Sequence, residues 1–419
     1  MNRLPESTQT LIVGGGVIGV CIAYYLTKRG RAVTLVEKAD ICAGSSHGNA
    51  GMIAVAHSIP IAAPGVLTQG LRWLLDAGSP FYIKPRPELD LLRWLWHFQA
   101  ACTKARMLRG ISVLLDLSVQ SLALFESLAA TEDLAFDFER KGLLHLYLTE
   151  KIFAKGVKDA ETLQEFGVEA TILDQAGVRQ MEPNVNDSVI AGIFYPEPAH
   201  LRPDRFVHQL TAVAERAGAQ ICAHTEVLSF EKSGSRITGV TTTRGRIRAE
   251  EVVLAAGAWS SILARQVGLR LALQPAKGYS ITTKRPGTCP GLPLALDERK
   301  IAVTPMGADL FRFSSTLELA GFDSSINQRR LTATRQGISE YLPGMTDLEI
   351  IEIWRGYRPA SPDGLPFIGR SERISNLIFA TGHGMLGLTQ GPITGQLVAQ
   401  IIGGEPPSID LTPLRPERF

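Results

Sequence analysis

Three glycines near the start of the chain, followed by an acidic residue at a set distance, have the spacing of a dinucleotide-binding motif. Gly14, Gly16 and Gly19 stand in G-x-G-x-x-G order after the apolar run LIV, and a helix is predicted to follow. The first glycine permits a tight turn, the second lets the backbone approach a pyrophosphate, and the third lets helix and strand pack closely. Glu37 ends the next apolar run, where its carboxylate suits a ribose diol and repels a 2′-phosphate. We therefore expect a dinucleotide without a 2′-phosphate.

Length and composition indicate an ordinary soluble globular protein. It has 419 residues, of which 45% are apolar and 20% charged, with a net charge of +2. This length predicts two domains, and the small net charge argues against a nucleic-acid partner. The five cysteines form no C-x-x-C pair, so we expect no metal site, no disulfide framework and a cytoplasmic location. The polar N-terminus predicts no signal peptide, and the longest apolar stretch, residues 11–26, is too short to span a bilayer.

Two further segments predict parts of the same nucleotide-binding domain. Residues 377–380 form an apolar run followed by a glycine-rich loop and a helix that ends at Gly403-Gly404. Residues 203–217 have the pattern of an amphipathic helix and lead through short strands to Val252–Ala255, which breaks at Gly257. A glycine at a strand end permits close approach of a ligand to the backbone. The domain is therefore expected to be assembled from residues 1–87, 196–272 and 341–419.

The two intervening segments are expected to form a second, substrate-binding or cap domain from residues 88–195 and 273–340. Strands are predicted at residues 143–148, 279–282 and 310–313. The predicted fold class is therefore α/β with α+β insertions: a Rossmann-like nucleotide-binding domain and a discontinuous domain built on a mixed or antiparallel sheet. Three nucleotide-domain pieces separated by two insertions are typical of flavoproteins.

With these pieces in place, the chain resembles the FAD-dependent amine oxidoreductases of the D-amino-acid oxidase/glycine oxidase superfamily. Within it, the chain is most similar to the small subunit of bacterial D-amino acid dehydrogenases. Besides GGGVIG and Glu37, the segments that carry the resemblance are NAG at 49–51, KGYS at 277–280, LDERKIAVT at 296–304, WRGYRPASPDGLPFIGR at 354–370 and TGHGMLG at 381–387.

The resemblance implies non-covalently bound FAD and oxidation of a D-amino acid to an imino acid, which water hydrolyses to an oxo acid. A close variant takes D-proline or hydroxy-D-proline. Two departures bear on the substrate: FSSTLE at 313–318 stands where the family prefers glycines, and SSHG at 45–48 is closer to the sarcosine-oxidase branch. An oxygen-using amine oxidase of sarcosine or glycine type, and a non-catalytic flavin-binding subunit, are the alternatives.

Three residues are the candidates for the substrate side of the site. Arg358 occupies the position that holds a substrate carboxylate in similar enzymes, and a planar guanidinium binds a carboxylate through two parallel hydrogen bonds. Tyr279 is expected to donate to the same carboxylate and to wall the pocket, with a core position in the sheet as the alternative. His383 is expected to face the flavin or to satisfy the backbone of its loop. No general base is assigned, because hydride transfer needs positioning and a neutral amine.

The motifs and the resemblance together imply a larger set of cofactor contacts. These residues are Gly14, Gly16, Val17, Ile18, Gly19, Glu37, Lys38, Ser45, Ser46, His47, Asn49, Ala50, Gly51, Met52, Val227, Gly257, Trp259, Gly382, Gly384, Met385, Leu386, Gly387, Leu388 and Thr389.

The sequence leaves the electron acceptor open between a quinone or other carrier and oxygen. Leu91–Phe98, rich in tryptophan and leucine, precedes Lys104, Arg106 and Arg109, and Arg72 and Trp73 add to the pattern. Such a segment suits the inner face of an anionic membrane, and a helix packed over the active site is the alternative. A partner subunit is also left open.

Overall fold

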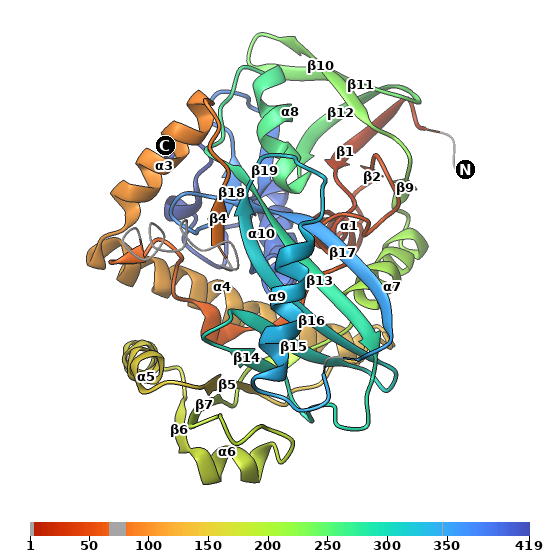
Figure 1. The fold of residues 1–419 in the computed structure, drawn as a ribbon. Helices are drawn as coiled ribbons and strands as arrows, with labels where there is room; N and C mark the ends of the chain where they lie inside the picture. The colour runs from red at the N-terminus through yellow and green to blue at the C-terminus, as the bar shows by residue number, and fades with distance from the viewer. Residues whose placement is uncertain (1–3, 67–80, 346) are drawn as a thin grey trace.

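The computed structural model describes residues 4–66, 81–345 and 347–419, which are organised around two large β-sheets (Figure 1). Five strands of the first sheet run parallel in the order β9-β2-β1-β12-β19, and β18 adds an antiparallel edge. The strands are β1 (Ser7–Val13), β2 (Val33–Val36), β9 (Gln220–Cys222), β12 (Gly245–Leu254), β18 (Phe367–Arg370) and β19 (Leu377–Thr381). The ends and the middle of the chain therefore meet in one sheet.

Helices cover one face of this sheet and an antiparallel extension lies beside it. Apolar side chains of α1 (Val17–Thr27), α4 (Lys104–Thr131), α7 (Pro203–Arg216) and α10 (Gly391–Gly403) share one buried core. The extension consists of β10 (Val227–Ser233) and β11 (Arg236–Thr242), which continue from β12, and α8 (Ser260–Gln266) packs into a second core there. Pro203 opens α7 in the first turn, where its missing N–H costs no hydrogen bond.

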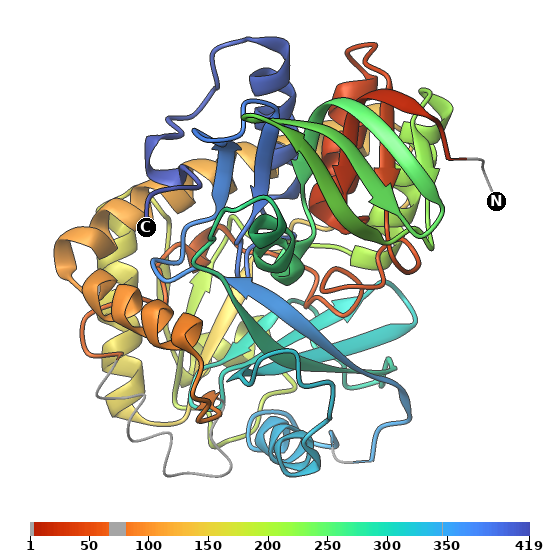
Figure 2. The ribbon, with the colours of Figure 1, turned by 90° about the horizontal axis from the view of Figure 1, so that it is seen from above.

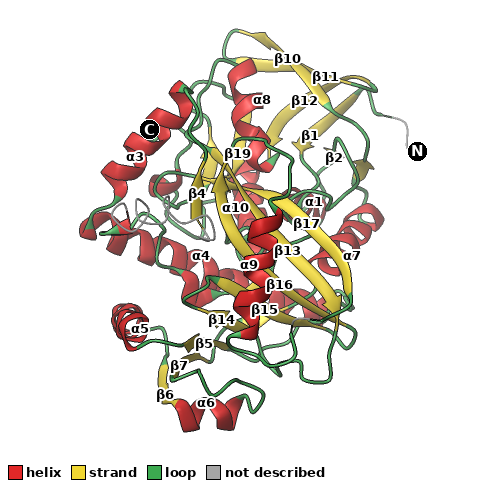
Figure 3. Ribbon diagram, viewed as in Figure 1, coloured by secondary structure: helices red, strands yellow, loops and turns green. Residues whose placement is uncertain are grey.

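The second sheet is mostly antiparallel, in the order β17-β13-β16-β15-β14-β5-β7-β6, with β4 beside β16. Its strands are β4 (Phe81–Ile83), β5 (Leu143–Tyr147), β6 (Thr171–Asp174), β7 (Ala191–Tyr195), β13 (Gln274–Lys284), β14 (Leu294–Leu296), β15 (Ile301–Met306), β16 (Leu310–Leu319) and β17 (Ile350–Ala360). Helix α9 (Gln328–Ser339) lies across β13 and β16 in the view of Figure 3, and its apolar residues join the core of this sheet. A small third sheet pairs β3 (Met52–Ile53) with β8 (Ala199–His200).

The remaining helices lie at the margins of the second sheet. Helices α5 (Glu150–Gln164) and α6 (Gln175–Met181) follow β5 and β6, and α3 (Leu89–Ala101) lies on the outside of the molecule in both Figure 1 and Figure 2. Short 3₁₀ helices occur at η1 (Val55–His57), η2 (Gly257–Trp259) and η3 (Thr412–Leu414). The α/β class with a second, mostly antiparallel sheet is therefore the one predicted.

The second sheet also takes two strands from beyond the expected domain boundaries. Both β4 and β17 lie in segments that the sequence assigned to the nucleotide-binding domain. The cause for β17 is its long antiparallel pairing with β13, from Gln274 opposite Ala360 to Thr283 opposite Ile350. The strand that carries Arg358 is thus part of the second sheet.

Helix α4 is the one described helix whose length and apolar composition would allow it to cross a membrane. Half of its most apolar window is buried inside the fold, where Leu114, Leu117 and Phe125 pack in the core beneath the first sheet. These contacts are those of a core helix.

Gly19 lies where α1 crosses the turn after β1, and this contact leaves no space for a side chain. A Cβ at this position would stand 1.9 Å from the carbonyl oxygen of Gly14. We expect Gly19→Ala to cost about 2–3 kcal/mol of folding free energy, because backbone atoms must move apart. Gly287→Ala is the control, since a Cβ there meets open space at an ordinary φ. Denaturant melts monitored by circular dichroism measure both, and equal stabilities would contradict the close-packing role of Gly19.

Candidate active site

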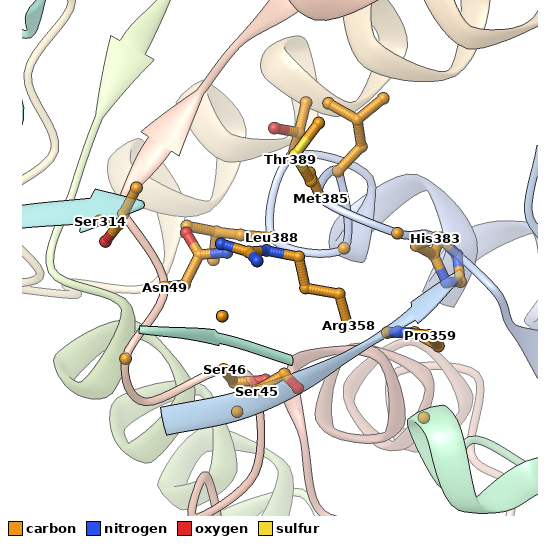
Figure 4. Close-up of a pocket in the computed structure, with 18 of the residues that line it drawn as sticks. Ser45, Ser46, Asn49, Ser314, Arg358, Pro359, His383, Met385, Leu388 and Thr389 are labelled. Atoms are coloured by element: carbon orange, nitrogen blue, oxygen red, sulfur yellow. The ribbon is translucent and has the colours of Figure 1, made fainter. Parts of the chain in front are cut away.

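One cavity of about 870 Å³ is lined by residues of both sheets and of the loops between them. Its wall includes the turn after β1, residues 43–46 and 48–50, the face of the second sheet, and the loop between β19 and α10. Figure 4 shows part of this wall, with Arg358, Ser314 and Asn49 around the same space as Met385 and Thr389. The cavity thus gathers segments that are far apart in sequence.

The turn after β1 has the geometry expected for a bound dinucleotide. Glu37 accepts hydrogen bonds from Gly15 N at 2.8 Å and Ala39 N at 3.0 Å, so its carboxylate is fixed at the end of β2. Ser46 Oγ accepts from Val17 N at 2.9 Å, in the first turn of α1. The positive end of the α1 dipole points into this part of the cavity, where phosphates are stabilised. These backbone groups and the fixed carboxylate suit a pyrophosphate and a ribose.

Lys38 and Trp259 close the wall near this turn. The Lys38 ammonium lies 3.6 Å from the centre of the Trp259 ring, and Val227 and Gly257 line the cavity beside them. Thr381 Oγ1 donates to Gly257 O at 2.9 Å, and this bond connects the end of β19 to the start of η2. A cation over an indole ring is a favourable contact, so both side chains have a defined orientation.

The loop between β19 and α10 is attached directly to the strand that carries Arg358. Gly384 N donates to Pro359 O at 2.9 Å, and Ala360 forms a bridge with His383. At the other end of the loop, Thr389 Oγ1 accepts from Ala54 N at 3.2 Å. The loop residues that line the cavity are therefore fixed on both sides.

Arg358 extends from β17 into the cavity (Figure 4). Its Nη1 donates to Thr316 O at 2.7 Å, and the guanidinium lies over Gly278, where a Cβ would stand 2.0 Å from Nη1. Burial lowers the pKa of Arg358 to about 10, so the side chain is still cationic at neutral pH. A cationic, planar donor group in a cavity is suited to a carboxylate.

His383 turns its ring away from this group and toward α10. Its Nε2 is 2.9 Å from Thr394 Oγ1, and the ring is buried. Burial lowers the pKa of His383 to about 3, so the imidazole is neutral. The ring therefore bonds a side chain of α10 and not the backbone of its own loop, while the residue also lines the cavity.

Tyr279 uses its hydroxyl on the side of the sheet that faces α9. The hydroxyl donates to Glu318 Oε1 at 3.1 Å and accepts from Asn327 N at 3.2 Å. Glu318 also pairs with Lys277 at 3.4 Å and with Arg330 at 3.0 Å. Although Tyr279 contributes to the cavity wall, its hydroxyl is thus engaged in a buried charge cluster and is not directed at the Arg358 guanidinium.

Most of the residues expected to contact the cofactor line this cavity, and four do not. Gly19 packs against Gly14 beneath the turn, and His47 pairs with Glu352 at 2.9 Å. Gly51 (φ +77°) and Gly382 (φ +84°) lie behind the wall, where a Cβ would meet Leu201 O at 2.4 Å and Phe367 Cδ2 at 2.7 Å. Gly51 and Gly382 thus allow the backbone conformation that brings the neighbouring residues to the cavity wall.

Several residues of the site had no assignment from the sequence. Arg312 is buried and donates to His47 O at 2.8 Å and Asn49 O at 2.9 Å, so it holds the loop that precedes β3. His57, His145 and Asp297 also line the cavity. The motif LDERK contains Asp297, but only the fold brings it to a histidine 152 residues away.

The comparison with known proteins assigns the family. The model of the FAD-dependent oxidoreductase family (DAO) matches residues 9–401, and the chain belongs to this family. D-amino acid dehydrogenase of Granulibacter bethesdensis is 33% identical over 98% of this chain and 99% of its own length. D-amino acid dehydrogenase of Vibrio atlanticus is 32% identical over 98% of this chain and 100% of its own. The resemblance found in the sequence is confirmed, and the glycine turn, Glu37 and the α1 N-terminus fit the nucleotide part of FAD.

Solved structures confirm the fold class. Glycine oxidase from Geobacillus kaustophilus superposes with a TM-score of 0.81 at 24% identity, over 99% of this chain and 100% of its own. L-proline dehydrogenase from P. horikoshii gives a TM-score of 0.77 at 22% identity, over 99% and 98%. At these identities the likeness concerns the fold alone.

The hydrogen bonds of Tyr279 predict that its hydroxyl serves stability. We expect Tyr279→Phe to lower the free energy of unfolding by about 1–3 kcal/mol, because buried Glu318 and Asn327 N each lose a partner. The KM for the amine substrate should stay within about twofold, which corresponds to less than the weakest hydrogen bond. Denaturant melts and steady-state kinetics measure the two effects. A raised KM at unchanged stability would instead place the hydroxyl on the substrate.

Proposed function

We propose that this chain is an FAD-dependent D-amino acid dehydrogenase that holds its cofactor without a covalent link and passes the electrons to a quinone or another carrier. The observation that carries the proposal is Arg358, a cationic guanidinium inside the cavity, fixed beside the loop that ends at Thr389. The names of the full-length relatives support the D-amino acid as substrate. The absence of cysteine after Cys289 supports non-covalent binding.

In this proposal the residues of the chain bind and orient the substrate. Arg358 holds the substrate carboxylate, and its bond to Thr316 O keeps the guanidinium in one orientation. FAD, when bound in this cavity, would supply the hydride acceptor for the Cα hydrogen. No side-chain base is required, because the amine need only be neutral and correctly placed. The buried Ser314 hydroxyl has no partner among the described residues, so it is available to the amine or to the edge of the cofactor.

A cyclic secondary amine such as D-proline or hydroxy-D-proline is the close variant, because it presents the same carboxylate beside a CH–NH group. A non-catalytic flavin subunit is disfavoured, because such a protein needs no cation in the cavity. An oxygen-using amine oxidase of sarcosine or glycine type is the other alternative, and it differs both in the acceptor and in the substrate.

We further propose that the outer face of α3 contacts a membrane, where a quinone dissolves. Leu89, Leu92 and Trp96 are exposed by 69%, 56% and 66% and recur at helical spacing. The opposite face is anchored, since Trp94 Nε1 donates to Ala360 O at 2.9 Å. The inner face therefore supports packing of this helix against the rest of the fold, and the outer face is the one that we propose to contact the membrane. Arg72 and Trp73 lie outside the described residues.

The proposed binding of the substrate carboxylate by Arg358 is tested by removing the charge of this side chain. We expect Arg358→Leu to retain FAD but to lose anaerobic flavin bleaching by D-amino acids roughly 100-fold or more in kcat/KM, since two charge-assisted hydrogen bonds are lost. Arg355→Leu is the matched control on the same strand, because Arg355 Nε donates to Ser324 O outside the cavity. Bleaching that survives in Arg358→Leu would overturn the assignment, and a wild-type protein bleached by no amine would overturn the proposed function.

The acceptor is tested by following both products of reoxidation. With a D-amino acid that bleaches the flavin, we expect reduction of a quinone analogue or dye and little hydrogen peroxide, because the relatives are dehydrogenases. Peroxide at the rate of bleaching, without dye reduction, would establish an oxidase instead.

The membrane contact of α3 is tested on its outer face. Leu92→Asp and Trp96→Asp together should lower binding to anionic vesicles, because charge replaces apolar surface.

A further inference from the structure

Strand β16 contains a β-bulge at the point where its backbone meets Arg358. The pairing of β16 with β13 shifts by one residue at Gly278, so Thr316 and Leu317 both stand opposite this glycine. In a bulge whose first residue is left-handed, that residue is ordinarily glycine, whereas here it is Thr316 with a φ of +73°. Six described non-glycine residues have a positive φ, and Thr316 is the only β-branched one among them. A β-branched residue is strained in this conformation.

The bulge turns the Thr316 carbonyl toward the guanidinium of Arg358. In a regular ladder a carbonyl lies in the plane of the sheet and bonds the next strand, but the guanidinium lies above the sheet, over Gly278. The bulged backbone reaches it, and Arg358 Nη1 donates to Thr316 O at 2.7 Å. Nε and Nη2 have no protein partner in the part of the chain that the structure describes. The carbonyl therefore leaves free an edge of the guanidinium that can bind a carboxylate through two parallel hydrogen bonds.

A buried ion pair closes the ladder immediately after the bulge. Lys277 and Glu318 lie directly opposite one another, are 1% and 4% exposed, and place their charged groups 3.4 Å apart. Glu318 also pairs with Arg330 of α9 at 3.0 Å, and Lys277 Nζ donates to Ser325 O at 2.9 Å. If Thr316 relaxed to a negative φ, the strand beyond it would shift and separate charges that water does not reach, which is costly.

We propose that Lys277 and Glu318 are positioning residues for the substrate, because they hold Thr316 in its left-handed conformation and so keep its carbonyl on Arg358. Strain of this kind persists only where the surrounding structure enforces it, and the ion pair beside α9 supplies that constraint for a group at the cavity wall. The pair thus acts on carboxylate binding without touching the substrate. This inference rests on the proposed function, in which Arg358 binds the substrate carboxylate.

The first test removes the ion pair and measures carboxylate binding. Calorimetric titration of the FAD-loaded enzyme uses propanoate, the unreactive deamino analogue of D-alanine, and propanamide, which lacks the charge, is the ligand control. We expect Glu318→Gln to weaken propanoate binding about tenfold, as for a weakened hydrogen bond to a charged group. The KM for D-alanine should rise by the same factor. The rate of anaerobic bleaching at saturation should change less than about threefold, because the carboxylate is held equally in the ground state and the transition state.

Glycine at position 316 shows whether the ion pair acts through the strained residue. Glycine adopts the left-handed conformation without steric cost, so Thr316→Gly should keep propanoate binding within about twofold of the wild type. In the Thr316→Gly background, Glu318→Gln should then weaken binding by less than about twofold. Thr316→Ala is the matched control, since alanine shortens the side chain but retains the strain, and Glu318→Gln should still weaken binding about tenfold in that background.

An effect of Glu318→Gln that is equal with glycine and with threonine at position 316 would overturn the proposal, and so would unchanged propanoate binding in Glu318→Gln. Tyr279→Phe removes one hydrogen bond of Glu318 but leaves both ion pairs, so it should keep propanoate binding. If Glu318→Gln loses its flavin absorbance, Lys277→Met replaces it, since Glu318 then remains paired with Arg330. If glycine restores propanoate binding but no D-amino acid bleaches the flavin, the positioning role stands and the proposed function fails.

Discussion

The alternation of side chains along β13 is the constraint on which both faces of the second sheet depend. Gly278 lies beneath the Arg358 guanidinium at the cavity wall, whereas the Lys277 ammonium and the Tyr279 hydroxyl belong to the buried charge cluster beside α9. Because side chains of a strand alternate, a shift by one residue would turn Lys277 and Tyr279 into the cavity and Gly278 out of it. The guanidinium of Arg358 needs the space above Gly278, so its position on β17 is usable only in the observed register.

The buried charges behind the sheet hold this register. Lys277, Glu318 and Arg330 are each less than 5% exposed and meet around the Tyr279 hydroxyl. Desolvation offsets much of the attraction in a buried pair, so such a cluster is weak evidence for stability. The cluster does enforce the pairing of β13 with β16, since a shift of either strand would leave an unpaired charge in the core. It lies next to the irregularity between β13 and β16, where Thr316 has a φ of +73° and offers its carbonyl to Arg358.

The parts of the site that could be predicted from sequence are those whose physics is local. The turn at Gly14, the helix after it and Glu37 lie within one short segment, and their roles follow from spacing alone. KGYS was identified as a motif, but its spacing does not tell which face of β13 meets the cavity, and the Tyr279 hydroxyl lies in the charge cluster. The pairing of His145 with Asp297 could not be found, because it depends on the register of β5 with β14 across 152 residues.

The loops of the first sheet and the strands of the second are joined at three places around the cavity. Arg312 on β16 donates to His47 O and Asn49 O, Ser45 Oγ donates to Tyr357 O at 2.6 Å, and Gly384 N donates to Pro359 O. Each bond spans the two parts of the chain, and two of them end beside Arg358. The Arg358 guanidinium and the glycine turn after β1 are therefore held by one continuous network. In the proposed reaction, this network would fix the distance from the substrate Cα to the cofactor before the substrate binds. Such preorganisation would replace a side-chain base, because the proposed hydride transfer depends on position more than on proton transfer.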